Sequence, residues 1–193
     1  MYEEIKVTVY TRVYNTPPEM LRRCIESVLQ QTHNNFEYLL CDNGSTDGSA
    51  DIMKEYRDKD QRIILHRCEN NFEIDWMAYS GDNAIGKYIT ALDSDDWLEP
   101  RFLDNTIELA EKKQLDIVCT GSYFVNEQGK YIGERSIQNT LILTPGQYAV
   151  AYPDYHAFFR VGWGKLISTI LWKKGCYEKP PKEIGTYGCD TLF

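Results

Sequence analysis

Five short runs of apolar, β-branched and aromatic residues recur along the first 120 residues of the chain. Runs of this composition form buried strands when polar turn residues bound them. The runs that predict strands are 6–10, 36–41, 62–66, 88–92 and 116–120. We therefore expect a sheet to form the centre of the fold.

The segments between these runs have the periodicity of amphipathic helices. In the first segment, apolar residues repeat at helical spacing and define one buried face: Leu21, Ile25, Val28 and Leu29. Thr16 and Glu19 have the spacing of a capping box, with Pro17 at the first helical position. Further helices are predicted from Ser49 to about residue 56 and over residues 100–114.

Alternating strands and helices predict a parallel, doubly wound sheet with helices on both faces. Residues 122–134 differ, because they have the pattern of a hairpin that turns near Gln128 and Gly129. The C-terminal part should therefore add mixed or antiparallel strands, with helices starting at Thr144 and over 166–174. With 193 residues and no linker or repeat, the chain should form a single domain.

Three carboxylates follow the fourth predicted strand, in the sequence Ala-Leu-Asp-Ser-Asp-Asp-Trp-Leu at 91–98. Residues two apart on a strand point the same way, so Asp93 and Asp95 should face one ligand together. Their oxygens suit Mg²⁺ or Mn²⁺, which bridge to the phosphates of a bound nucleotide. The motif favours a nucleotide-dependent transfer reaction, although an isolated Asp-x-Asp is equally compatible with a solvated acidic turn.

Two other polar residues stand at the ends of predicted strands. Thr11 follows the first strand and Asp42 follows the second. Parallel strands end at one edge of the sheet, and α/β sheets bind their ligands there. We therefore expect Thr11, Asp42 and Asp93 to meet at this edge although they are far apart in sequence.

Composition narrows the function classes further. A net charge of -8 argues against a nucleic-acid partner, which requires clustered basic residues. Residues 1–4 lack the features of a secretion signal, and no stretch is long and apolar enough to span a bilayer. Six cysteines without a Cys-x-x-Cys pair argue against a zinc site. We expect a cytoplasmic protein, and leave open both peripheral association with the inner face of the membrane and homo-oligomer formation.

Together the separated motifs resemble the family 2 glycosyltransferases, which bind nucleotide sugars with the GT-A fold. The resemblance rests on the segments 7–15, 24–32, 37–49 and 88–98, and the third is similar to the family's Asp-Asp-Gly-Ser-Thr-Asp-Gly-Ser signature. It implies a GT-A domain over residues 1–193, with a nucleotide-sugar-binding half (1–98) and an acceptor-side half (99–193). The chain is expected to be shorter than its relatives at the C-terminus.

The resemblance also implies roles for individual residues. Asp42 would accept a hydrogen bond from the uracil N–H, and the backbone near Tyr10 and Thr11 would frame the base. Asp93 would lie toward the ribose and the metal, and Asp95 would hold Mn²⁺ or Mg²⁺ against the diphosphate. A carboxylate suits the uracil imide because it accepts and does not donate, so a UDP-sugar is the expected donor.

The closing segment 188–193 resembles the acceptor side of the family. It implies that Asp190 is the general base that deprotonates the acceptor hydroxyl, so that transfer inverts the anomeric carbon. Three residues depart from the family pattern: Cys189 replaces a Glu, Asn43 replaces an acid, and Met77 replaces a frequent Arg.

The sequence thus predicts an inverting, metal-assisted glycosyltransferase that moves a sugar from a nucleotide sugar to a glycan or a lipid-linked saccharide. Two other classes remain open. One is a nucleotide-sugar-binding protein with weak transfer, in which Cys189 and Met77 are the lesions. The more distant one is a sugar nucleotidyltransferase, which would be expected to have a Gly-rich basic loop after its first strand, whereas residues 11–18 contain no glycine.

Overall fold

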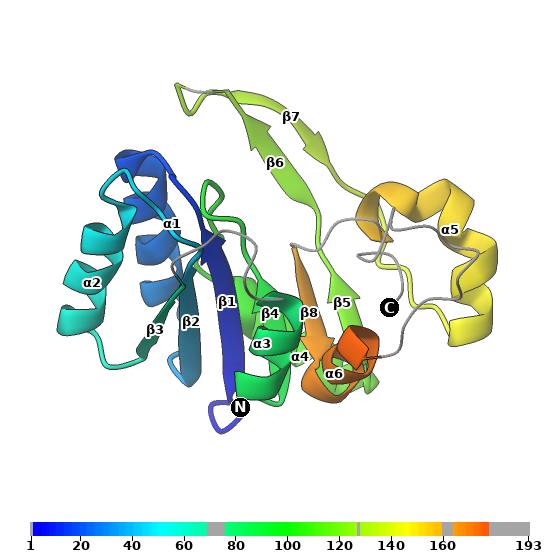
Figure 1. Ribbon diagram of the computed structural model, residues 1–193. Helices are drawn as coiled ribbons and strands as arrows, with labels where there is room; N and C mark the ends of the chain where they lie inside the picture. The colour runs from blue at the N-terminus through cyan, green and yellow to red at the C-terminus, as the bar shows by residue number, and fades with distance from the viewer. Residues whose placement is uncertain (1, 69–75, 127, 160–163, 178–193) are drawn as a thin grey trace.

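The computed structural model describes residues 2–68, 76–126, 128–159 and 164–177 of the chain. The strands of the main sheet are β1 (Val7–Val13), β2 (Phe36–Asp42), β3 (Ile63–Arg67), β4 (Tyr88–Ala91), β5 (Ile117–Cys119) and β8 (Lys165–Ser168). Their order is β3-β2-β1-β4-β8-β5, and β1 to β4 run parallel while β8 lies antiparallel to β4 and β5 (Figure 1). The predicted α/β class, mostly parallel with a mixed C-terminal part, is confirmed.

Helices cover both faces of this sheet. They are α1 (Pro18–Leu29), α2 (Ser49–Lys59), α3 (Trp76–Asn83), α4 (Phe102–Lys113), α5 (Pro145–Phe159) and α6 (Thr169–Tyr177). Apolar residues of α1, α2 and α4 form one core cluster with Val7, Val9 and Val13 of β1. Residues of α3 and α6 form a second cluster on the opposite face, around Tyr10 and Ile89. Figure 1 shows α5 to the side of the sheet, beyond β5.

The structure of β2 explains why the apolar run at residues 36–41 predicts a strand in the centre of the sheet. All of its residues are buried, as expected for a parallel strand that is covered on both faces. Its one charged residue before the last position, Glu37, is only 3% exposed and accepts hydrogen bonds from the Thr8 hydroxyl (2.6 Å) and the Ile85 amide (2.8 Å). These hydrogen bonds connect β1, β2 and the segment before β4.

Two further strands, β6 (Ser122–Val125) and β7 (Tyr131–Arg135), form a separate antiparallel hairpin. It projects away from the main sheet (Figure 1). The predicted hairpin over 122–134 is therefore confirmed. Gly129 adopts a φ of 74°, a left-handed conformation that glycine reaches without a steric penalty.

One predicted element was wrong, and one helix was not predicted. Residues 165–168 form β8, and the helix begins only at Thr169, whereas the sequence predicted one helix over 166–174. The run around Leu166 and Ile167 is buried between two strands, and a short apolar run cannot be assigned to strand or helix by periodicity. The sequence also failed to predict α3, whose weak amphipathic pattern does not identify a helix.

Candidate active site

Carboxylates lie at the carboxyl edge of the sheet on both sides of β1. Asp42 is the last residue of β2 and pairs with Val13 of β1. Ala91 ends β4 and pairs with Tyr10 of β1, and Asp93 follows two residues later. Neighbouring strands lie about 4.8 Å apart, so β2 and β4, on the two sides of β1, are separated by on the order of 10 Å across the sheet. The structure therefore brings Asp42 and Asp93 to the same edge.

Asp42 has one oxygen available for a ligand. Its side chain is 1% exposed, and Oδ1 accepts a hydrogen bond from the backbone N–H of Ser45 at 2.8 Å. Within the described residues, Oδ2 is buried without a hydrogen-bond partner, although Nε of Arg67 lies 3.3 Å away in an ion pair. Buried polar atoms are nearly always hydrogen-bonded, so this oxygen is suited to accept an N–H from a bound molecule.

The carboxylates after β4 lie on a turn, not on a strand. β4 ends at Ala91, and the amide of Asp96 donates to the carbonyl of Asp93 at 3.1 Å. Asp93 and Asp95 therefore do not alternate on a strand, which was the geometry from which we expected them to face one ligand. The turn, not strand alternation, gathers Asp93, Asp95 and Asp96, and we call residues 92–101 the acid loop.

The charges of this turn disfavour one another. Partial burial raises the pKa of Asp96 to about 6, and the nearby carboxylates of Asp95 and Asp93 contribute to that shift. The pKa of Asp93 is also raised, first by loss of hydration and then by Asp95, while Arg12 acts in the opposite direction. A turn with this much repulsion is suited to a ligand that brings positive charge.

The donor set fits a hard divalent cation. Carboxylate oxygens are the ligands that Mg²⁺ and Mn²⁺ prefer, and Mg²⁺ usually takes only one or two of them, with waters and phosphate oxygens completing its shell. Among the described residues, no three ligating side chains are gathered closely enough to hold a metal by themselves. The acid loop therefore fits a cation that is shared with a bound diphosphate, with Asp93 and Asp95 as the protein ligands.

Replacing Asp96 with asparagine should stabilise the metal-free protein. The pKa of Asp96 is higher in the folded state, about 6, than its ordinary value of 3.8, so the folded state binds this proton more tightly. Wild-type stability should then fall as pH rises from about 4 through 6. At pH 7.5 we expect Asp96→Asn to raise the free energy of unfolding by about 1 kcal/mol after solvent screening, with the gain disappearing below about pH 4.

Chemical denaturation of both proteins across this pH range, in the presence of a chelator, measures the effect. Glu108→Gln, at an exposed position of α4, is the matched control and should leave stability unchanged. Equal stability of the Asp96→Asn variant and the wild type at pH 7.5 would contradict the expected repulsion.

Thr11 does not lie where the sequence placed it. β1 continues to Val13, so Thr11 lies within the strand, and the prediction that it follows the strand was wrong. Its side chain is buried, and its hydroxyl accepts a hydrogen bond from the Tyr38 hydroxyl at 3.0 Å. Tyr10 points to the opposite face, into the cluster with α3 and α6. At the carboxyl edge, β1 therefore ends with Val13.

The residues that depart from the family pattern lie in separate parts of the structure. Asn43 is buried, and its Oδ1 accepts from Sγ of Cys68 at 3.6 Å, so a carboxylate there would bury a charge. Met77 belongs to α3 and packs against the Tyr10 cluster. Cys189 and Asp190 lie outside the described residues.

Two arginines at this edge were not identified from the sequence. Arg67, the last residue of β3, forms the ion pair with Asp42, and Arg12 of β1 acts on the carboxylate of Asp93. Both residues stand one or two positions after a predicted strand. Cations at strand ends, considered together with the acids, were the signal that could have identified them.

The fold and this edge are those of an α/β protein that places a buried carboxylate and an acid turn at the carboxyl ends of its parallel strands. The sequence matches the glycosyl transferase family 2 over residues 8–173. The glycosyltransferase GlyA of Streptococcus pneumoniae serotype 4 is 35% identical over 204 residues, which cover 98% of this chain and 27% of GlyA. The chain therefore belongs to the glycosyl transferase family 2 and carries the glycosyltransferase domain of that family.

Solved structures share the fold at low sequence identity. The crystal structure of S. aureus TarS 1-349 matches with a TM-score of 0.73 at 20% identity, over 98% of this chain and 54% of TarS 1-349. A complex of the same protein with UDP-GlcNAc matches 91% of this chain and 49% of that one, with a TM-score of 0.70 at 19% identity. The mannosyltransferase PcManGT from Pyrobaculum calidifontis, in complex with GDP-Man and Mn²⁺, matches 59% of this chain and 34% of its own, with a TM-score of 0.52 at 18% identity.

The chain spans about a quarter of the length of GlyA and about half of TarS 1-349. In the part of the chain that the structure describes, no helix combines the length and the apolar character needed to cross a bilayer.

Proposed function

We propose that this domain binds a UDP-sugar and transfers the sugar, with inversion and with the help of Mn²⁺ or Mg²⁺, to a glycan or a lipid-linked saccharide. The observation that carries the proposal is the buried Oδ2 of Asp42, which receives no hydrogen bond from any residue the structure describes and lies at the same edge as the acid loop. That arrangement offers an acceptor for a base and carboxylates for a metal diphosphate, separated by one strand.

Each residue has a distinct task in this proposal. Asp42 accepts the N3–H of uracil, and its burial excludes water that would compete for the same oxygen. Asp95 and Asp93 hold the cation beside the diphosphate. The cation, when bound, neutralises the charge that develops on the leaving nucleoside diphosphate. Asp190 removes the proton of the acceptor hydroxyl as that oxygen attacks the anomeric carbon.

The two halves of the chain divide this work. Residues 1–98 contain Asp42 and the metal ligands and form the donor half of one domain, and residues 99–193 contain Asp190 and form the acceptor half. Support for a UDP-sugar donor comes from TarS, which shares the fold and was solved with UDP-GlcNAc. Support for a metal comes from PcManGT, which was solved with Mn²⁺.

Calorimetric titration of UDP, CDP and GDP, each with and without Mn²⁺, tests the proposal. UDP should bind only with the metal, and at least about tenfold more tightly than CDP. Cytosine has no N3–H and presents an acceptor there, so its lone pair would oppose Oδ2 of Asp42. Equal affinity for UDP and CDP would contradict the role of Asp42, and metal-independent binding would contradict the role of the acid loop.

A further inference from the structure

Asn15 and Thr16 connect β1 to α1 and lie between the two loops of the candidate site. On one side is the loop that follows Asp42, which we call the base loop (residues 43–49). On the other side is the acid loop. The sequence predicted a helix cap at Thr16, but the cap residue of α1 is Pro17, and no side chain in the described part of the chain caps the start of this helix. The Thr16 hydroxyl is therefore free to serve another purpose.

The Asn15–Thr16 segment is bonded to the base loop at several points. The Asn15 amide donates to Oγ of Ser45 at 3.1 Å, and the Thr46 amide donates back to Oδ1 of Asn15 at 2.8 Å. The Thr16 amide donates to Oγ of Ser49 at 3.2 Å. Asn15 adopts a φ of 49°, in the left-handed region that Asn tolerates better than most residues. The segment is thus held in one conformation against the base loop.

The side chain of Thr16 connects the Asn15–Thr16 segment to the acid loop. Oγ1 of Thr16 and Oγ of Ser94 are 2.7 Å apart, and Ser94 stands between Asp93 and Asp95. Thr16 is 4% exposed, so water does not readily replace this bond. Behind it, Sγ of Cys24 donates to the carbonyl of Asp93 at 3.4 Å.

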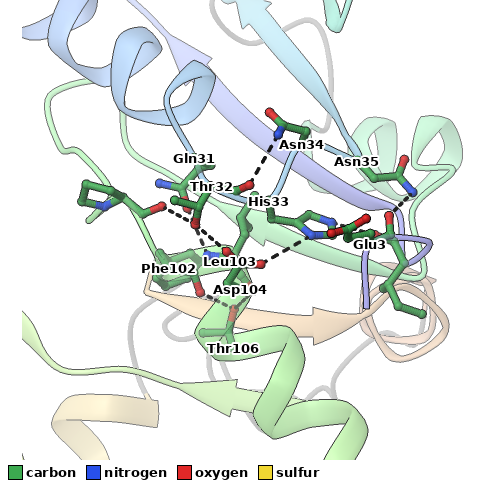
Figure 2. Close-up of polar contacts among 12 residues, drawn as sticks. Glu3, Gln31, Thr32, His33, Asn34, Asn35, Phe102, Leu103, Asp104 and Thr106 are labelled. Atoms are coloured by element: carbon green, nitrogen blue, oxygen red, sulfur yellow. Dashed lines mark hydrogen bonds and ion pairs between the residues drawn. The ribbon is translucent and has the colours of Figure 1, made fainter. Parts of the chain in front are cut away.

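The far end of the acid loop is anchored independently. Oγ of Ser27 accepts from the Leu98 amide at 3.1 Å. The side chain of Gln31 accepts from the Leu103 amide at 3.0 Å and donates to the carbonyl of Glu99 at 2.8 Å. Figure 2 shows Gln31 and Thr32 beside the first turn of α4. With this end fixed, the Thr16–Ser94 bond joins the carboxylate end to the Asn15–Thr16 segment, next to the contact from Cys24 of α1.

We propose that Thr16 is a positioning residue that sets the metal-binding carboxylates of the acid loop in register with the base loop. The inference rests on the proposed function, because it assigns Thr16 a role in metal-dependent UDP binding. Residues that orient metal ligands typically change metal affinity by about 10- to 100-fold when they are replaced.

Three variants separate positioning from simple stability. Thr16→Val keeps the shape of the side chain and removes the hydroxyl, and Thr16→Ser retains the hydroxyl. Thr106→Val is the matched control, because Thr106 is 3% exposed and its hydroxyl bonds only to carbonyls of its own helix, at 2.7 and 3.2 Å. Thermal unfolding of each variant measures the loss of stability.

The first readout is the Mn²⁺ concentration at which UDP binding is half-maximal. We expect Thr16→Val to raise it by about tenfold or more, and Thr16→Ser and Thr106→Val to leave it near the wild-type value. Wild-type Mn²⁺ dependence in Thr16→Val would overturn the inference, whatever its stability.

The second readout needs no ligand. Amide hydrogen exchange at Ser45, Thr46 and Asp96 should become faster in Thr16→Val than in Thr106→Val. If the wild type shows no metal-dependent UDP binding, the proposed function fails. Hydrogen exchange alone then tests whether Thr16 connects the base loop to the acid loop. Faster exchange in both loops would then support it, and unchanged exchange would overturn it.

Discussion

Asp95→Ala is expected to abolish metal-dependent binding of UDP, with a loss of affinity of more than about 100-fold. The reason is that Asp95 is proposed to bind the cation directly, and even residues that only orient metal ligands change affinity by about 10- to 100-fold. The remaining carboxylates of the turn are fewer and less crowded, so the raised pKa values of Asp93 and Asp96 should also fall toward the ordinary range.

Calorimetric titration of UDP in the presence of Mn²⁺ measures this loss. The matched control is Glu108→Ala, which removes an exposed carboxylate from α4 and should bind UDP like the wild type. Binding by Asp95→Ala with wild-type affinity and wild-type metal dependence would remove Asp95 from the metal site.

Asp190→Asn is expected to spare nucleotide binding and to remove transfer. Loss of a general base typically reduces the rate by about 10²- to 10⁴-fold, and asparagine keeps the size of the side chain without its basicity. The measurement is UDP release from a panel of UDP-sugars in the presence of a panel of oligosaccharide acceptors, together with UDP titration of the same variant.

The contrast between the two variants is the sharper test. Asp95 and Asp190 are assigned to different steps, so only Asp95→Ala should lose binding. Asp154→Asn, at an exposed position of α5, is the control for the acceptor half. Equal loss of UDP binding in Asp95→Ala and Asp190→Asn would contradict the division of roles, and wild-type transfer in Asp190→Asn would exclude it as the base.

The local pattern of the chain was sufficient to predict the parallel part of the fold. β2 is apolar on both faces because helices cover both, and its sequence shows this without further information. Once the strands were assigned as parallel, Asp42 and Asp93 had to reach the same edge. The family resemblance followed from the same residues, and the match over 8–173 confirms it.

The sequence alone did not determine which strands and helices pack against one another in the C-terminal part of the fold. β8 inserts between β4 and β5 from the far end of the chain, and no local pattern in residues 165–168 indicates which strands will flank it. The same limit applies to α3, whose burial against α6 depends on contacts between distant segments. Periodicity reports which faces are buried and carries no information about their partners.

The details of the candidate site divide in the same way. The sequence predicted that Asp42 and Asp93 stand near strand ends, because the apolar runs that precede them are local features. Tertiary structure decided that Oδ2 of Asp42 receives no hydrogen bond from the described residues, and that Thr16 bonds to Ser94 instead of capping α1. Each of these depends on hydrogen bonds or burial created by residues distant in the chain, and such contacts exist only after the sheet has assembled.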